Sequence, residues 1–174
     1  GTVSRSDSVG YLPQDPRTGD LNITARERIL SARGLDDIVR RMQAAEVVMA
    51  SGDMDKLERA MKRYSNAEAE FIAAGGYAAE AEASAIATSL GLPVRVLSQE
   101  LNTLSGGQGR RIELARILFS GAETLLLDEP TNHLDADSII WLRGFLQSYP
   151  GGVVVISHDV HLLEAIVNRV FYLD

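Results

Sequence analysis

The chain has 174 residues, of which 45% are apolar and 24% charged, a composition typical of a globular domain with one sizeable core. Its formal charge of −7 argues against attraction of the whole surface to nucleic acid or anionic lipid, because such binding needs an excess of Lys and Arg. No apolar run reaches the roughly 20 residues of a membrane-spanning helix, and residues 1–10 lack the layout of a secretory signal. The lack of cysteine excludes disulfides, zinc ribbons and cysteine nucleophiles, and we expect a cytoplasmic location.

The first elements are short. Residues 9–12 form an apolar and aromatic run that predicts a strand, and the turn-forming residues that follow predict a loop over 13–22. Thr24, followed three residues later by Glu27, is a capping-box pattern that predicts a helix over 25–33.

Two longer helices are predicted next, one starting near Asp36 and one over about 54–74, and the short Ser51-Gly52-Asp53 link favours antiparallel packing. Met and aromatic side chains at helical spacing favour a hairpin seam over a cofactor site. The predicted seam consists of Ile38, Met42, Ala45 and Met49 on the first helix and Met54, Leu57, Met61, Tyr64 and Phe71 on the second.

Basic residues also gather in this hairpin, as the pairs Arg40-Arg41 and Lys62-Arg63. Acidic neighbours nearly cancel their charge, so we expect a solvated helical face rather than a nucleic-acid patch.

The last part of the chain alternates strands and helices. The unbroken apolar runs at 124–127 and 153–156 predict parallel strands that are covered on both faces. Helices are expected over 78–90, 109–119, 137–148 and 160–167, and a further strand over 170–173.

The sequence LSGGQ at residues 104–108 opens the predicted helix 109–119. Free backbone N–H groups at a helix start bind anions, and glycine lets a phosphate approach them closely. An ordinary helix capped by Ser105 is the alternative reading.

Two neighbouring acids, Asp128 and Glu129, follow the strand at 124–127, and His158 follows the strand at 153–156. Because parallel strands bind ligands at their C-terminal ends, we expect these three side chains at one edge of the sheet. Asp128 suits Mg²⁺, Glu129 suits activation of a water, and His158 suits contact with a phosphate. The alternatives are a polar strand-to-loop transition and a helix cap at Asp159 with His158 merely exposed. His133 and His161 show no spacing of a metal site.

Taken together, the motifs resemble the ABC ATPase family, whose core is a P-loop α/β fold. The similarity rests on LSGGQ at 104–108, LLLDEP at 125–130, TNHLD at 131–135, ISHD at 156–159 and YLPQD at 11–15, which is similar to that family's Q-loop. TNHLD and the stretch at 73–92 resemble more narrowly the ABC-F branch of soluble twin-domain ATPases, many of which act on the ribosome in translation control or antibiotic resistance.

The resemblance implies ATP and Mg²⁺ as cofactors of the intact protein. Gln14 would contact Mg²⁺ and water, Asp128 would hold Mg²⁺, Glu129 would be the catalytic base, and His158 would sense the γ-phosphate. A signature motif of this kind would cover ATP held by a second ATPase domain. The residues with this role in trans would be Ser105, Gly106, Gly107 and Gln108, with Asp135 linking the two sites.

One motif of the family is missing, because the sequence contains no G-x-x-x-x-G-K-[ST] phosphate-binding loop (Walker A). We therefore interpret the chain as a fragment that is inactive alone. Its predicted parts are 1–22, a core strand and Q-loop; 23–103, a helical subdomain with an arm-like hairpin at about 36–74; and 104–174, the signature helix and the hydrolytic part of the core.

The main alternative is the ATP-binding subunit of a membrane transporter, which has the same motifs. The long helical insertion between Gln14 and Ser105 favours ABC-F, since transporter subunits resemble one another in having a shorter one. A DNA-repair ABC ATPase fits less well, and a pure binding module remains a third hypothesis. For the intact protein, the resemblance implies an ATP-driven switch that engages the ribosome through residues 36–74.

Overall fold

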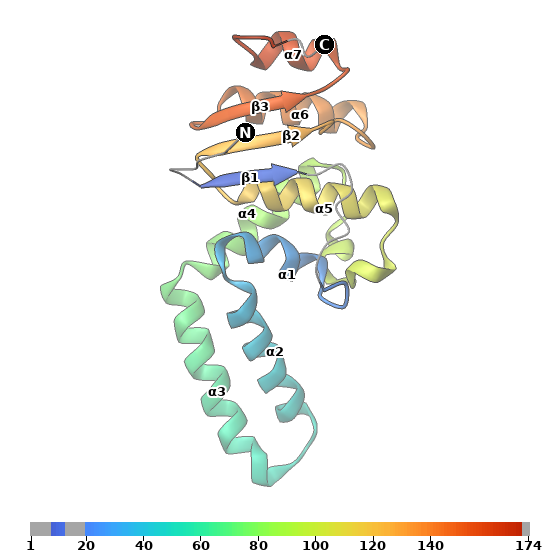
Figure 1. The fold of residues 1–174 in the computed structure, drawn as a ribbon. Coiled ribbons are helices and arrows are strands. Elements are labelled where there is room, and N and C mark those ends of the chain that lie inside the picture. The colour runs from blue at the N-terminus through green and yellow to red at the C-terminus, as the bar shows by residue number, and fades with distance from the viewer. Residues whose placement is uncertain (1–7, 13–19, 172–174) are drawn as a thin grey trace, which may run out of the picture.

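A computed structural model describes residues 8–12 and 20–171 of the chain. A three-stranded parallel sheet lies at one end of the molecule and a long helical hairpin extends from the other (Figure 1). The strands β1 (Val9–Leu12), β2 (Thr124–Asp128) and β3 (Gly152–Ile156) pair in that order, with Thr124 aligned with Val9 on one side and Gly152 on the other. All three strands therefore end at the same edge of the sheet.

The sheet is covered on one face. Leu125 and Leu127 of β2 are buried in the core, together with residues of α5 (Gly106–Phe119) and α6 (Ala136–Gln147). On the opposite face Val154 and Ile156 are more than half exposed. The prediction of strands covered on both faces is therefore wrong for the described residues. The helices formed by these residues cover only one face of the sheet.

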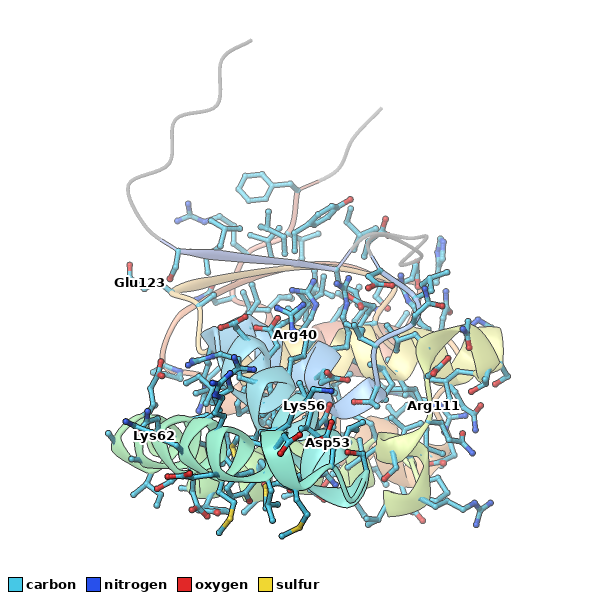
Figure 2. All side chains as sticks on the ribbon, turned by 90° about the horizontal axis from the view of Figure 1, so that it is seen from below. Arg40, Asp53, Lys56, Lys62, Arg111 and Glu123 are labelled. Atoms are coloured by element: carbon cyan, nitrogen blue, oxygen red, sulfur yellow. The ribbon has the colours of Figure 1, made fainter. Side chains whose placement is uncertain are left out.

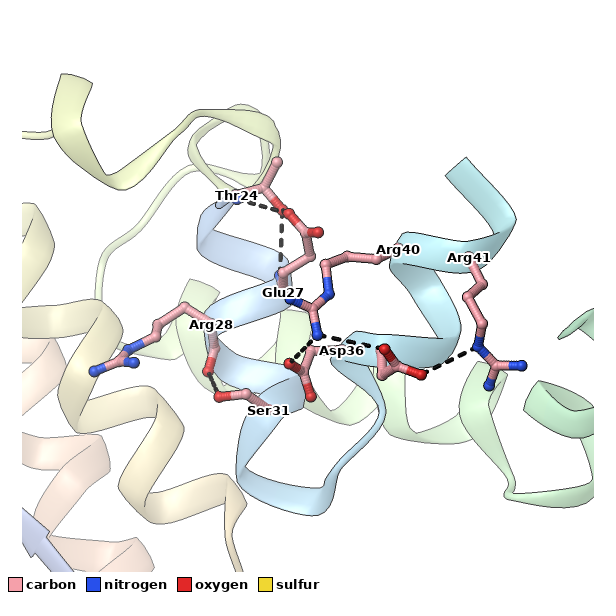
Figure 3. Close-up of polar contacts among 8 residues, drawn as sticks. Thr24, Glu27, Arg28, Ser31, Asp36, Arg40 and Arg41 are labelled. Atoms are coloured by element: carbon pink, nitrogen blue, oxygen red, sulfur yellow. Dashed lines mark hydrogen bonds and ion pairs between the residues drawn. The ribbon is translucent and has the colours of Figure 1, made fainter. Parts of the chain in front are cut away.

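A short helix, α1 (Ala25–Leu30), begins the helical region and continues as the 3₁₀ turn η1 (Ser31–Arg33). The predicted capping box is present: the Thr24 hydroxyl accepts from the Glu27 amide at 3.2 Å, and the Glu27 carboxylate accepts from the Thr24 amide at 2.7 Å (Figure 3). This cap satisfies backbone donors that the first turn would otherwise leave unpaired.

The hairpin consists of α2 (Asp36–Ala50) and α3 (Met54–Ala73), which lie side by side (Figure 1). The predicted seam of α2 is confirmed, since Ile38 and Ala45 are buried and its two methionines are partly buried. The predicted seam of α3 is wrong at Met54 and Met61, which are 77% and 53% exposed. The residues of α3 that are buried or partly buried instead include Leu57, Ala60, Tyr64, Ala67 and Phe71.

This rotation of α3 has a packing reason. Ala60 and Ala67 are seven residues apart, and both are almost fully buried. Small side chains at these two positions let the helix backbones approach closely, which the longer methionines would prevent. No helix of residues 8–12 and 20–171 is long and apolar enough to cross a membrane.

The connection back to the sheet starts with α4 (Gly76–Ser89), which begins after Gly75 in the left-handed conformation. Two 3₁₀ turns, η2 (Val94–Ser98) and η3 (Leu101–Thr103), then lead into α5. The last helix is α7 (Val160–Ile166). Val170 and Phe171 are not in a strand, so the strand predicted over 170–173 is absent as far as the described residues extend.

Gly76 provides a test of the packing between α3 and α4. A Cβ atom at Gly76 would lie 2.4 Å from ring carbons of the buried Phe71, so we expect Gly76→Ala to cost about 1–3 kcal/mol. Thermal unfolding followed by circular dichroism should then show a midpoint lower by roughly 3–10 °C.

The matched control is Gly144→Ala in α6, where an added Cβ meets no atom within 4 Å. That change should raise stability by up to about 1 kcal/mol, since alanine is the better helix former. Equal shifts in the two variants would contradict the predicted clash at Phe71.

Candidate functional site

The first part of the candidate site is the start of α5. Ser105 is its N-cap, and the Ser105 hydroxyl oxygen accepts from the Gln108 amide at 3.2 Å. The Gln108 side-chain oxygen in turn accepts from the Ser105 amide at 3.0 Å. Gly106 follows as the first residue of the helix and is exposed. The capping box fixes the backbone of this turn, and the Ser105 hydroxyl keeps its own proton for donation outward.

The second part is the pair of acids after β2. Asp128 ends the strand, and Glu129 has a backbone φ of 46°, in the left-handed region that residues other than glycine rarely adopt. The Glu129 amide donates to the carbonyl oxygen of Ile156 at 2.8 Å, so β3 holds this turn in place. The Glu129 side chain is 14% exposed. Its carboxylate therefore has a fixed position at the edge of the sheet.

His158 belongs to the same edge. Its Nε2 atom lies 3.4 Å from Oε1 of Glu129, and its backbone amide donates to Oε2 of Glu129 at 3.4 Å. The imidazole itself is 99% exposed. Asp159 caps α7 by accepting from the Leu162 amide at 3.0 Å, so the cap and the contact between His158 and Glu129 are both present.

Arg110 connects these two parts, and the sequence analysis assigned it no role. It lies on α5, is 7% exposed, and its guanidinium donates to the backbone carbonyl oxygen of Asp128. Burial lowers the pKa of Arg110, and the nearby carboxylates of Asp128 and Glu129 raise it. No pattern in the sequence singled out Arg110, because the same helix also carries Arg111, Glu113 and Arg116. A buried arginine needs a partner, but its burial follows only from the fold.

The loop between β2 and α6 lies against the start of α5. A Cβ atom built on Gly107 would lie 3.6 Å from Cβ of His133, an ordinary van der Waals distance, so the two positions are neighbours. At the end of the loop, Asp135 caps α6 by accepting from the Ser138 amide at 2.9 Å. This hydrogen bond is the main reason why the pKa of Asp135 is lowered, and the charge of Arg111 contributes further.

Arg111 also reaches the end of the helical region, because its Nη1 atom donates to the carbonyl oxygen of Gly91 at 3.2 Å. A Cβ atom on Gly91 would lie 2.9 Å from the Asp135 carboxylate and 3.1 Å from Nη1 of Arg111. The loop after α4 and the cap of α6 therefore meet around one arginine.

The structure thus brings Asp128, Glu129 and His158 to one sheet edge, with the loop that ends at Asp135 running to the start of α5. Gln14 lies outside the described residues. Within residues 8–12 and 20–171 there is no group of three or more His, Asp or Glu side chains that could hold a metal ion.

Comparison with known proteins matches residues 2–132 to the family described as ABC transporter. Over 94% of its length the chain is 39% identical to the putative ATP-binding protein YdiF of Bacillus subtilis. It is 35% identical over 95% of its length to the energy-dependent translational throttle protein EttA of Haemophilus influenzae. It is also 35% identical over 99% of its length to the tylosin resistance ATP-binding protein TlrC of Streptomyces fradiae.

The chain spans 26%, 29% and 32% of the lengths of these three relatives, in that order. Among solved structures, it is similar to a complex of the archaeal ribosomal stalk protein aP1 and the archaeal ribosome recycling factor aABCE1. The TM-score is 0.57 at 20% identity, over 97% of this chain and 25% of that one. At this identity the match shows the shared fold.

The cap of α6 makes a pH prediction possible. Because the folded pKa of Asp135 is lowered, its ionised form stabilises the fold at neutral pH. This contribution should be complete above about pH 4 and be lost as the pH falls through the lower pKa of the folded state. Asp135→Asn should therefore lower the unfolding midpoint at pH 7 and have a shrinking effect towards pH 2.5, measured by thermal unfolding at each pH.

Asp137→Asn is the matched control, since this exposed carboxylate lies in the same first turn and accepts no hydrogen bond from the described residues. A deficit of Asp135→Asn that stays constant from pH 7 to pH 2.5 would contradict the proposed role of the ionised cap.

Proposed function

Since the chain belongs to the ABC transporter family of ATP-binding domains, we propose that it is the hydrolytic part of an ATPase domain in a longer ABC-F protein. Its relatives include the ABC-F proteins EttA and TlrC. The observation that carries the proposal is the 3.4 Å approach of Glu129 and His158 at the edge where Asp128 also ends its strand. This edge is where parallel α/β sheets bind their ligands.

Each of these residues has a proposed task toward ATP. The Asp128 and Glu129 carboxylates are the oxygen donors that Mg²⁺ prefers, and a Mg²⁺ bound mainly by phosphates needs only one or two protein ligands. Asp128 would hold the ion, whose charge would stabilise the transferred phosphoryl group. Glu129 would take a proton from the attacking water, and its fixed position suits this task.

His158 would donate a hydrogen bond to the γ-phosphate, and its imidazole is accessible, because it is 99% exposed although it contacts Glu129. Gln14 would contact Mg²⁺ and the water, as the resemblance to a Q-loop implies. The start of α5 would cover ATP bound to a second ATPase domain, through Ser105 and the N–H groups of Gly106 and Gly107, with Gln108 fixing the turn. Asp135, in the loop beside this start, would link the two sites.

The proposed setting is the cytoplasm, and the proposed partner is the ribosome. The names of two relatives support this partner, a translational throttle protein and a tylosin resistance protein. The hairpin of α2 and α3 is the part of the chain that extends farthest from the sheet (Figure 1), and it would make the contact. Translation control and antibiotic resistance both fit this arrangement.

We predict that the 174-residue chain alone hydrolyses no ATP, because it lacks the Walker A loop that would hold the β- and γ-phosphates. Phosphate release by the purified chain with ATP and Mg²⁺ should equal that of its Glu129→Gln variant. Turnover above this background that disappears in the variant would show that the chain holds ATP without that loop.

We also predict that the full-length protein with Glu129→Gln sediments with ribosomes when ATP is present. The substitution keeps the side-chain shape but removes the proton acceptor, so the protein should stay in its ATP-bound state. Glu123→Gln, at an exposed position before β2, is the control and should behave as the wild type. Equal sedimentation with and without ATP would speak against the switch, and binding to membranes instead would favour the transporter alternative.

A further inference from the structure

Three parts of the chain that are far apart in the sequence meet at Gly91, in the loop that follows α4. A Cβ atom built there would lie 2.9 Å from Oδ2 of Asp135, 3.1 Å from Nη1 of Arg111 and 3.2 Å from Oγ of Ser138. We call these four residues the Gly91 junction. It brings together the end of the helical region, the helix α5 and the cap of α6.

A glycine is needed at position 91 for two reasons. Its backbone φ of 74° is in the left-handed region, which costs free energy for a residue with a side chain. A side chain there would also crowd the junction. Gly34 shares the first reason but not the second, because its φ is 71° and an added Cβ would meet no atom within 4 Å. The comparison of the two positions therefore isolates the crowding.

Arg111 is the cation of the junction. Its Nη1 atom donates to the carbonyl oxygens of Gly91 at 3.2 Å and of Leu90 at 3.5 Å, at the C-terminal end of α4. A cation is favoured there, since free carbonyl groups give the end of a helix partial negative charge. The Nε atom of Arg111 is buried and has no hydrogen-bond partner among the described residues. A buried donor without a partner costs free energy, so another interaction must hold this guanidinium in place.

The carboxylate of Asp135 provides that interaction. Its Oδ1 atom accepts from the Ser138 amide at 2.9 Å, which leaves Oδ2 to face the junction. After the hydrogen bonds with Ser138, the charge of Arg111 lowers the pKa of Asp135 further, without a hydrogen bond between the two side chains. Asp135 is therefore held by α6 on one side and attracted by Arg111 on the other.

The junction adjoins both parts of the site that are proposed to act on ATP of a second domain. Arg111 lies roughly two turns along α5 from Ser105, the residue that caps its start. Asp135 ends the loop that lies beside this start. Figure 2 shows Arg111 on the side of the molecule toward which the strands run, opposite Glu123 before β2. A rigid helix thus connects Arg111 to the start of α5, and attraction between charges connects it to Asp135.

We propose that Arg111 is a positioning residue, which holds Asp135 in a fixed place relative to the start of α5 and to the end of α4. The inference rests on the proposed function, because Asp135 and the start of α5 would act together on ATP that a second domain holds. Arg111 itself touches no reacting atom. Its loss leaves Ser105 and Asp135 present but misaligned, and a displacement of about 1 Å can slow a reaction by roughly a hundredfold.

The first test measures ATP turnover by the full-length protein. Arg111→Gln should lower kcat about tenfold or more and change the KM for ATP less than about twofold, because it disturbs alignment and removes no contact with the nucleotide. Arg111→Lys should fall between this variant and the wild type, since lysine keeps the charge but lacks the guanidinium fork. The control is Arg95→Gln, at an exposed position in η2, which should behave as the wild type.

The second test reads the contact itself in the 174-residue chain. The carboxyl carbon of Asp135 is followed by NMR as the pH is lowered. Arg111→Gln should raise the pKa of Asp135, because a neighbouring positive charge that favours the ionised form is lost. Arg111→Lys and Arg95→Gln should leave this pKa close to that of the wild type. A role of Arg111 in packing alone would not produce this pattern.

The two glycines provide a third comparison. Gly91→Ala and Gly34→Ala both place a side chain in the left-handed region, but only Gly91→Ala pushes against Asp135 and Arg111. Gly91→Ala should therefore lower kcat of the full-length protein about tenfold, whereas Gly34→Ala should leave it within about twofold of the wild type. Circular dichroism checks that each variant keeps its helix content.

Three results would overturn the inference. The first is equal turnover by Arg111→Gln and Arg95→Gln, the second is a pKa of Asp135 that Arg111→Gln leaves unchanged, and the third is an equal kcat for the two glycine variants. If Arg111→Gln does not fold, Arg111→Lys takes its place in the turnover measurement, and wild-type turnover by that variant has the same meaning.

The outcomes also separate this inference from the proposed function. If the full-length wild type hydrolyses ATP and Arg111→Gln does so equally, the inference falls and the proposed function stands. If the wild type hydrolyses no ATP, the proposed function falls, and the NMR titration still decides whether Arg111 acts on Asp135.

Discussion

The buried carboxylate of Glu113 on α5 is the interaction on which much of this structure depends. Glu113 is 5% exposed and pairs with Arg28 of α1 and with Arg116 one turn further along α5. A buried carboxylate without a cation would cost several kcal/mol, so α1 and α5 have to keep this relative position. The pairing also fixes the rotation of α5 about its axis. Arg110, three residues earlier on the helix, is thereby directed at the end of β2.

A second constraint acts at the edge of the sheet. The left-handed backbone of Glu129 costs about 1–3 kcal/mol, and such strain persists only where the surroundings enforce it. Two hydrogen bonds enforce it here. The Glu129 amide donates to the carbonyl oxygen of Ile156 in β3, and the Arg110 guanidinium donates to the carbonyl oxygen of Asp128. The contact between Glu129 and His158 therefore exists only when β2 and β3 are paired in register and α5 is in place. Each part of the candidate site depends on elements that are distant in the sequence.

The hairpin connects to this arrangement through the same helices. α2 follows α1 after the 3₁₀ turn η1, and α1 and α4 both pack on α5, which begins within the LSGGQ sequence. A shift of the start of α5 toward a nucleotide would therefore be passed to α1 by the ion pair of Glu113 and Arg28, and from there to the base of the hairpin. This route would link the proposed ATP site to the hairpin that is proposed to contact the ribosome, as a switch requires.

Local patterns in the sequence were enough to locate most helices and strands and the residues of the sheet edge. Helix caps at Thr24, Asp53 and Ser105 need only hydrogen bonds within three residues, so short-range spacing predicts them. The C-terminal ends of parallel strands meet at one edge in any such sheet, which is why Asp128 and His158 could be placed together.

Contacts between distant segments decided the rest. The seam of α3 at Ala60 and Ala67 rather than at the methionines follows from how closely α2 can approach, which periodicity within one helix does not encode. Whether β3 is covered on one face or on both depends on which elements pack against the sheet. An apolar run in the sequence is compatible with either arrangement. The contact of Arg110 with the end of β2 arises from the rotation of α5, because rotation determines which side chains meet.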